Sequence, residues 1–205
     1  MRKKVKHLFY SLAHPANGFY EIRHEKKGSI FLAFALVLLY GISFSVNRQY
    51  ASFIVNDVNP LSINSFMEVL SVIALFFLFA IGNWSITCLM EGEGRLVDIL
   101  TITGYSLLPM VLMYLPCTLL SHIVAEKEEA FYFVLIGASI LYFIVLEVIG
   151  LMTIHNFTFG KTLVIILLTI VAIFVILFLL LLLVSIVQQI MMFFGGIYDE
   201  LMLRA

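Results

Sequence analysis

The sequence predicts an all-α, polytopic integral membrane protein with five transmembrane helices and short interfacial amphipathic helices. Two features of its composition indicate this fold class, because 62% of the 205 residues are hydrophobic and only 12% are charged. Soluble domains are about 45–50% apolar and about 25% charged. The third feature is the placement of the charges, which leave long apolar stretches between them. This composition argues against a water-soluble enzyme, a disordered chain or a nucleic-acid-binding protein.

Five apolar stretches are long enough to cross a bilayer. A transmembrane helix needs about 20 mainly apolar residues, because each residue adds about 1.5 Å against a hydrocarbon core about 30 Å thick. The predicted spans lie at about 29–47, 66–90, 107–125, 130–153 and 162–190. They divide the chain into a basic N-terminal segment (1–28), a membrane domain (29–193) and a short C-terminal tail (194–205). Gly195 and Gly196 are expected to end the last helix.

The third stretch, residues 99–125, allows two interpretations. It contains Gly104, Pro109 and Pro116, so its first part is predicted to be an interfacial segment that precedes a span from about residue 107. A proline in a membrane helix removes a backbone donor and is tolerated where neighbours satisfy the freed carbonyl groups. A re-entrant hairpin is the alternative, and it would leave four spans.

The basic residues predict the orientation. Seven of the twelve Lys and Arg residues precede the first span. With the N-terminus in the cytoplasm, nine basic residues lie inside, because the loops at 95 and 161 add one each. The positive-inside rule favours this placement, which leaves the C-terminus outside.

The N-terminal segment lacks the apolar run of a cleavable signal peptide. It is interpreted as a basic interfacial anchor on an anionic leaflet, ended by His14-Pro15, or as a docking surface for a cytoplasmic partner.

Three residues form a candidate intramembrane polar site: Glu147, Asn83 and Arg95. Glu147 lies well inside an apolar stretch, where a charge costs roughly 2.5–3.5 kcal/mol. It is interpreted as an ion-pair partner of Arg95 or Lys161 near the cytoplasmic headgroups, or as a proton- or ion-coupling group. Asn83 belongs to the polar inner half of the second span, which favours helix–helix packing through hydrogen bonds of about 0.6–2 kcal/mol. A lined substrate pocket is the alternative for Asn83.

Catalytic, cofactor and metal sites are not expected. The sequence lacks a Gly-x-Ser-x-Gly turn, a His-Glu-x-x-His helix and a phosphate-binding glycine loop. Cys88 and Cys117 lie in apolar segments, without the spacing of a metal site or a disulfide framework. His122 and His155 lie near the ends of their segments and are expected to be interfacial.

Several segments in order resemble the Yip family, the Ypt/Rab-interacting membrane proteins. They are a polar, tryptophan-bearing second span, the Gly92-x-Gly94 turn, an amphipathic connector and Gly104-Tyr105-Ser106-Leu107-Leu108-Pro109. The resemblance covers roughly residues 10–190, and it implies five helices with a cytoplasmic N-terminus and a short C-terminus on the far side. It assigns a structural role to the family-signature positions Gly92, Gly94, Gly104, Tyr105 and Pro109. It carries over no catalytic residue.

The resemblance also bears on partners. Eukaryotic relatives bind prenylated small GTPases through a long N-terminal region with an Asp-Leu-Tyr-Gly-Pro signature, which residues 1–28 lack, and this argues against a small GTPase as partner. The compact form resembles the prokaryotic branch of the family, which implies a cytoplasmic membrane.

The expected function is that of a non-catalytic scaffold or accessory protein that contacts lipids and either a second copy or another membrane protein, such as a transporter. The alternative is a small transporter, channel or lipid-moving protein that uses the intramembrane polar site.

Overall fold

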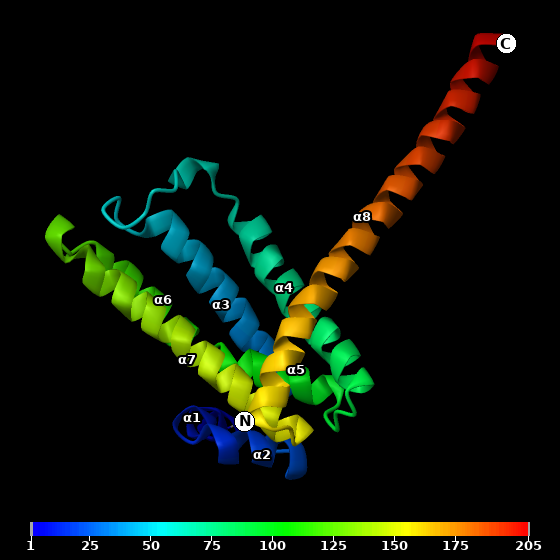
Figure 1. The fold of residues 1–205 in the computed structure, drawn as a ribbon. Helices are drawn as coiled ribbons and strands as arrows, with labels where there is room; N and C mark the ends of the chain where they lie inside the picture. The colour runs from blue at the N-terminus through cyan, green and yellow to red at the C-terminus, as the bar shows by residue number, and fades with distance from the viewer. Residues whose placement is uncertain (1, 205) are drawn as a thin grey trace.

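The computed structural model describes the backbone of residues 2–204 and the side chains of residues 4–197 and 202. This part of the chain is helical and contains no strand (Figure 1). Its elements are α1 (Arg2–Ala13), α2 (Pro15–His24), α3 (Ile30–Tyr50), η1 (Pro60–Ser62), α4 (Ser65–Leu89), α5 (Leu96–Ser106), α6 (Leu108–Ser121), η2 (Glu126–Glu128), α7 (Glu129–His155) and α8 (Phe159–Arg204).

Five helical segments of the described chain are long and apolar enough to cross a membrane. They are Ile30–Tyr50, Ser65–Leu89, Leu96–Ser121, Glu126–His155 and Phe159–Ile197. The all-α integral membrane fold predicted from the sequence is therefore confirmed. The third segment combines α5 and α6, and α6 runs beside α3 and α7 toward the end of the bundle that carries η1, rather than turning back. We call this end the η1 end.

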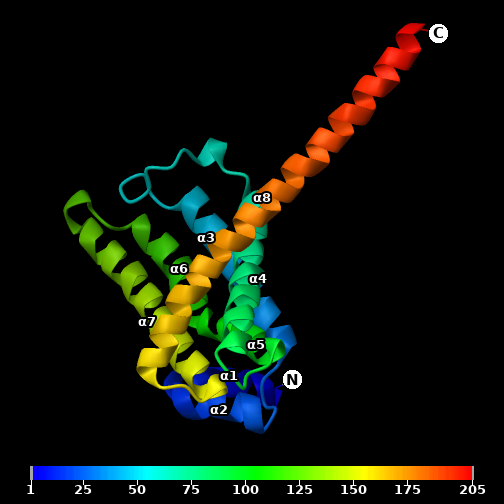
Figure 2. The same ribbon diagram turned by 45° about the vertical axis from the view of Figure 1, so that its right-hand side comes forward.

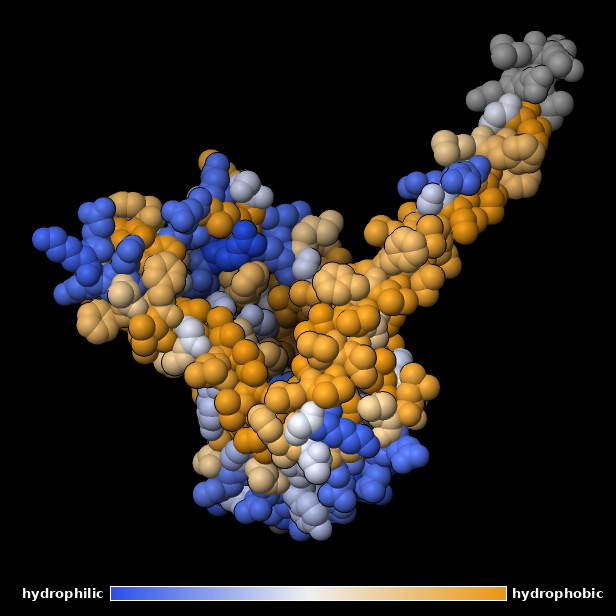
Figure 3. Space-filling view, viewed as in Figure 1, coloured by the Kyte–Doolittle hydropathy of each residue, from blue (hydrophilic) through white to orange (hydrophobic). Residues whose placement is uncertain are grey.

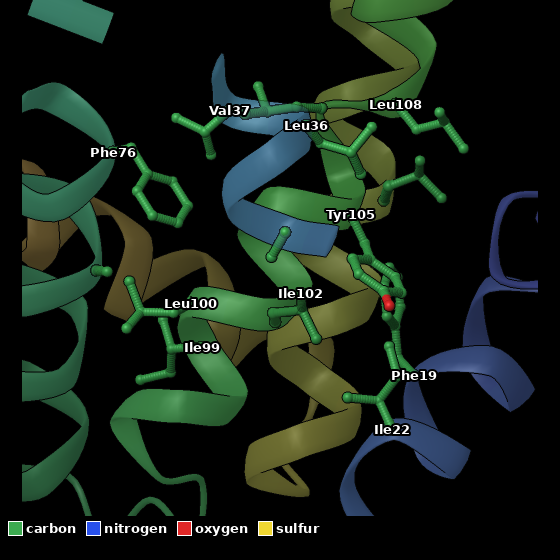
Figure 4. Packing of buried hydrophobic residues seen from close by; sticks show 14 of the residues in the cluster. Phe19, Ile22, Leu36, Val37, Phe76, Ile99, Leu100, Ile102, Tyr105 and Leu108 are labelled. Carbon is green, nitrogen blue, oxygen red and sulfur yellow. The ribbon is translucent and has the colours of Figure 1, made fainter. Parts of the chain in front are cut away.

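Helix α5 differs from the interfacial helix expected in this region. Its residues 98–106 are all buried, and it packs against α3, α4 and α7. Figure 4 shows Ile99 and Leu100 facing Phe76 of α4, while Tyr105 lies near Phe19 of α2. Three of its hydroxyl groups, those of Thr101, Thr103 and Tyr105, bond within the protein; Thr101 Oγ1, for example, donates to the Val97 carbonyl at 2.7 Å. Polar side chains satisfied in this way do not require water, so a mixed sequence can occupy the centre of a bundle.

The N-terminal helices are part of the bundle rather than only an anchor beside it. Helix α1 ends at Ala13 and α2 begins at Pro15, as the His14-Pro15 sequence predicts. The two helices pack closely at Gly18, where a Cβ would lie 2.5 Å from Ser11 Cα. Helix α2 buries Phe19 and Ile22 against the helices above it, so it closes the end of the bundle opposite η1 (Figure 1).

Only the first part of helix α8 belongs to the bundle. Its first part packs on α4, and the remainder projects away in both views (Figures 1 and 2). Every described side chain from residue 177 to residue 197 is exposed, and most are apolar. The expectation that Gly195-Gly196 end the helix is wrong, because α8 continues to Arg204. A helical glycine costs only about 1 kcal/mol relative to alanine, which a long helix tolerates.

Candidate functional site

Glu147, Asn83 and Arg95 do not form one site. Each bonds a different partner, and no hydrogen bond or ion pair among the described side chains joins any two of them. The sequence places all three toward one end of the bundle, but the helices direct them to three separate contacts.

Glu147 lies on α7 and is 5% exposed. Thr103 Oγ1 on α5 donates to its Oε1 at 2.7 Å, while its Oε2 has no hydrogen-bond partner among the described residues. The expected ion pair with Arg95 or Lys161 is not formed, since the Lys161 Nζ donates instead to the Met90 carbonyl at 2.8 Å. A buried carboxylate oxygen without a partner carries a desolvation cost and is available to a ligand or a proton.

Asn83 connects α4 to α8. Its Nδ2 donates to Thr169 Oγ1 at 3.1 Å, and Asn83 is fully buried. The neighbouring Gly82 permits the close approach, because a Cβ there would lie 3.3 Å from Ile173 Cγ1. These contacts support the helix-packing interpretation of the polar half of the second span.

Arg95 stabilises the start of α5. Its Nε donates to Asp98 Oδ2 at 3.0 Å, and its backbone N–H donates to the same oxygen at 3.2 Å. The hydrogen bond with Asp98 raises the pKa of Arg95 above its ordinary value, so the guanidinium stays charged. This arrangement is a helix cap, not a ligand site.

The Gly92-x-Gly94 turn holds the ring of His155. The Gly94 N–H donates to His155 Nδ1 at 3.1 Å. A Cβ at Gly92 would lie 2.6 Å from Nδ1, and a Cβ at Gly94 would lie 2.7 Å from Cε1, so the ring fits only against glycine backbone. The ring of Phe157 stacks on that of His155, with ring centroids 5.2 Å apart. His155 is therefore buried, 2% exposed, where the sequence predicted an interfacial side chain.

Arg23 joins the N-terminal segment to the same turn. Its guanidinium donates to Glu93 Oε2 at 2.6 Å and to the Ile154 carbonyl at the end of α7. One side chain of α2 thus contacts two segments distant in sequence. The sequence identifies Arg23 only as one of the basic residues that indicate the orientation of the chain, and no local pattern identifies its partners.

The remaining signature positions are also packing positions. A Cβ at Gly104 would lie 2.6 Å from Ala33 Cβ, so Gly104 allows α5 to lie directly on α3. Tyr105 is 2% exposed, and its hydroxyl accepts from the Ser29 N–H at 3.0 Å, which satisfies a free donor at the start of α3. Pro109 lies in the first turn of α6, where proline is compatible with a helix.

A second buried polar cluster, near the η1 end, was not predicted. Asn47 of α3 donates to Thr118 Oγ1 of α6 at 2.9 Å and to the Tyr132 hydroxyl of α7 at 2.8 Å. The cluster ties three helices together. An asparagine in the last turn of a span is the only sequence signal for it.

A groove of about 860 Å³ runs along α4. Side chains of the six helices from α3 to α8 form its mostly apolar walls, and Figure 3 shows the hollow between the apolar surface of α8 and the rest of the bundle. The buried residues Glu147 and Thr103 line the groove toward the α2 end of the bundle, and Arg48 and Glu68 line it at the η1 end, which we call its mouth. We call this feature the α4 groove.

The chemistry of these sites is that of packing and binding. Among the described residues, no group of three or more His, Cys, Asp or Glu side chains is placed to hold a metal ion.

Comparison with known families matches a family model described as "Yip1 domain" to residues 9–182. Comparisons with curated proteins and with solved structures give no match.

Proposed function

The chain belongs to the Yip1 domain family, and on that premise we propose that it is a non-catalytic membrane scaffold or accessory protein. It acts through contacts between its membrane helices and those of a second copy or of another membrane protein. The Gly92-x-Gly94 turn and the Gly104 contact support this proposal, because the signature positions build the fold rather than a reaction centre.

The single observation that carries the proposal is the free surface of α8. Its apolar stretch from residue 162 to residue 197 is about 54 Å long at 1.5 Å per residue, well beyond what a span of about 30 Å requires. A helix in this situation tilts, or it packs against another helix. Every described side chain of α8 beyond residue 176 is exposed. All sides of this part of the helix are therefore available to a partner.

The proposed setting is the cytoplasmic membrane of a prokaryote, with the N-terminus inside and the C-terminus outside. The excess of basic residues in the N-terminal segment supports this orientation. Membrane lipids are the other contact expected, and no nucleic acid or cofactor is proposed.

Photo-crosslinking tests the scaffold function in native membranes. A crosslinking residue at Leu181 is expected to give one dominant protein adduct, either a dimer or a single partner recovered in stoichiometric amount. The matched control is Leu141, which is 64% exposed against 70% for Leu181 but lies on α7, a helix of the packed bundle. Adducts with lipid alone at Leu181, together with a strictly monomeric protein in mild detergent, would contradict the proposal.

A second candidate function is a small transporter, channel or lipid-moving protein. The specific observation in its favour is Glu147, whose unpartnered Oε2 lies in a groove rather than in a sealed core. Flux across liposomes containing the purified protein tests it. Glu147→Gln is expected to abolish flux, and Asn83→Leu, which changes a packing contact, is expected to reduce it much less. Absence of flux in the parent protein would remove this candidate.

A further inference from the structure

The α4 groove has the shape of a site for a long apolar chain. Its lining residues on α4 extend from Met67 to Phe79. Twelve residue steps of 1.5 Å correspond to about 18 Å, somewhat more than the depth of one leaflet, about 15 Å. The walls between the two ends are apolar; they include Phe44, Val72 and Met110. The groove therefore matches a lipid chain in both length and chemistry.

The groove is open toward the bilayer. Helix α4 packs on α3, α5 and α8, and α7 packs mainly on α2, α5 and α6, so α4 and α7 are not packed directly against each other. The first part of α8 contacts α4 and, less extensively, α7, and the remainder projects away from the bundle rather than covering this side (Figures 1 and 3). A lipid chain can enter sideways through this opening without crossing water.

Two opposite charges stand at the mouth of the groove. Arg48 Nη1 on α3 bonds Glu68 Oε1 on α4 at 2.9 Å. The Arg48 side chain is 39% exposed, and an arginine has five N–H donors, so donors remain for another anion. Glu68 is 13% exposed, and its Oε2 is buried without a hydrogen-bond partner among the described residues. The mouth thus places the exposed donors of Arg48 beside a buried, unpaired oxygen of Glu68.

We propose that the α4 groove binds one acyl chain of an amine-bearing phospholipid, with the lipid phosphate at Arg48 and its ammonium group at Glu68. The two new contacts are charge-assisted hydrogen bonds, and they satisfy the unpartnered Glu68 oxygen. A zwitterionic headgroup adds no net charge at the mouth. An anionic lipid such as phosphatidylglycerol has no ammonium group to pair with Glu68; its hydroxyl groups can give only a hydrogen bond from a neutral donor, and its phosphate adds an uncompensated negative charge at the mouth. A choline headgroup has no N–H donor to give.

Native mass spectrometry of the purified full-length protein tests the proposal. The protein in detergent receives equal amounts of phosphatidylethanolamine, phosphatidylglycerol and phosphatidylcholine with identical acyl chains. Retention of phosphatidylethanolamine is expected to exceed that of the other two about tenfold, the change produced by one charge-assisted hydrogen bond. Glu68→Gln is expected to remove this preference. Arg48→Ala is expected to lower retention of all three lipids about tenfold.

Two further sets of variants locate the site. Ser71 is exposed on the groove-facing side of α4, so Ser71→Phe is expected to fill the groove and to abolish lipid retention. Glu126→Gln and Lys127→Ala are the matched controls, because both side chains are exposed at the η1 end without lining the groove. Each control is expected to retain lipid as the parent does.

The proposal is overturned if the parent protein retains no lipid or retains the three lipids equally. It is also overturned if Ser71→Phe, folded as judged by an unchanged thermal transition, retains lipid like the parent. A crosslinked dimer formed through the groove itself would show that a second copy occupies it instead. Failure of this lipid site leaves the scaffold proposal untouched, because that proposal is tested on α8.

Discussion

At the scale of single residues, three of the signature glycines are explained by what lies against them. Gly92 and Gly94 contact the ring of His155, and Gly104 contacts Ala33. In each case a Cβ would come within 2.7 Å of its neighbour, which is closer than real Cβ atoms lie. The need for glycine at these positions is steric, so substitution should affect stability before it affects anything else.

Gly94→Ala tests this explanation. The added Cβ would clash with His155, so we expect a loss of about 1–3 kcal/mol in the free energy of unfolding, measured in mixed detergent micelles. Gly137→Ala on α7 is the control, since a Cβ there meets nothing within 4 Å, and it is expected to be neutral or slightly stabilising. The explanation is wrong if His155→Ala fails to relieve part of the Gly94→Ala defect in the double variant.

At the scale of elements, the pair α4–α8 determines where the last helix is held. Asn83 and Thr169 provide its buried hydrogen bond, and Gly82 lets the two helices approach. Between membrane helices such hydrogen bonds matter because lipid offers no competing partner, although their net contribution is modest. The remainder of α8 has no comparable contact within the chain.

We therefore expect Asn83→Leu and Thr169→Val each to weaken the α4–α8 contact by about 0.6–2 kcal/mol. A double-mutant cycle on the free energy of unfolding is the measurement, and the two effects should not add, because both variants remove the same bond. Ser85→Ala is the control, since Ser85 is exposed and bonds only the Ile81 carbonyl of its own helix. Strictly additive losses would contradict the assigned hydrogen bond.

At the scale of the whole molecule, the two ends of the chain lie at opposite ends of the bundle. Helices α1 and α2 cover one end, and α8 projects past the other (Figure 1). The five membrane-length segments agree with this arrangement, because an odd number of crossings separates the termini.

Cysteine accessibility tests this topology. In a background of Cys88→Ala and Cys117→Ala, Asn17→Cys is expected to react with an impermeant maleimide only from the cytoplasmic side. Met202→Cys is expected to react only from the outside, together with Asn59→Cys in the loop before η1. Labelling of residues 17 and 202 from the same side would contradict both the crossing number and the orientation.

The sequence alone determined the class of the molecule and the positions of its apolar segments. Burial in lipid depends on composition and length, and both can be read without knowing any contact. The resemblance on Gly92, Gly94 and Gly104 likewise pointed to the correct family, as the match over residues 9–182 confirms.

Only the tertiary structure decided which polar groups meet. It buried α5 in the centre of the bundle, placed His155 under the glycine turn, and separated Glu147 from Arg95. Hydropathy shows which segments of the chain lie in the membrane. The partner of each polar side chain depends instead on the rotation of its helix and on the neighbouring helix against which it packs. The α4 groove is likewise a product of the tertiary structure, because side chains from six different helices line it.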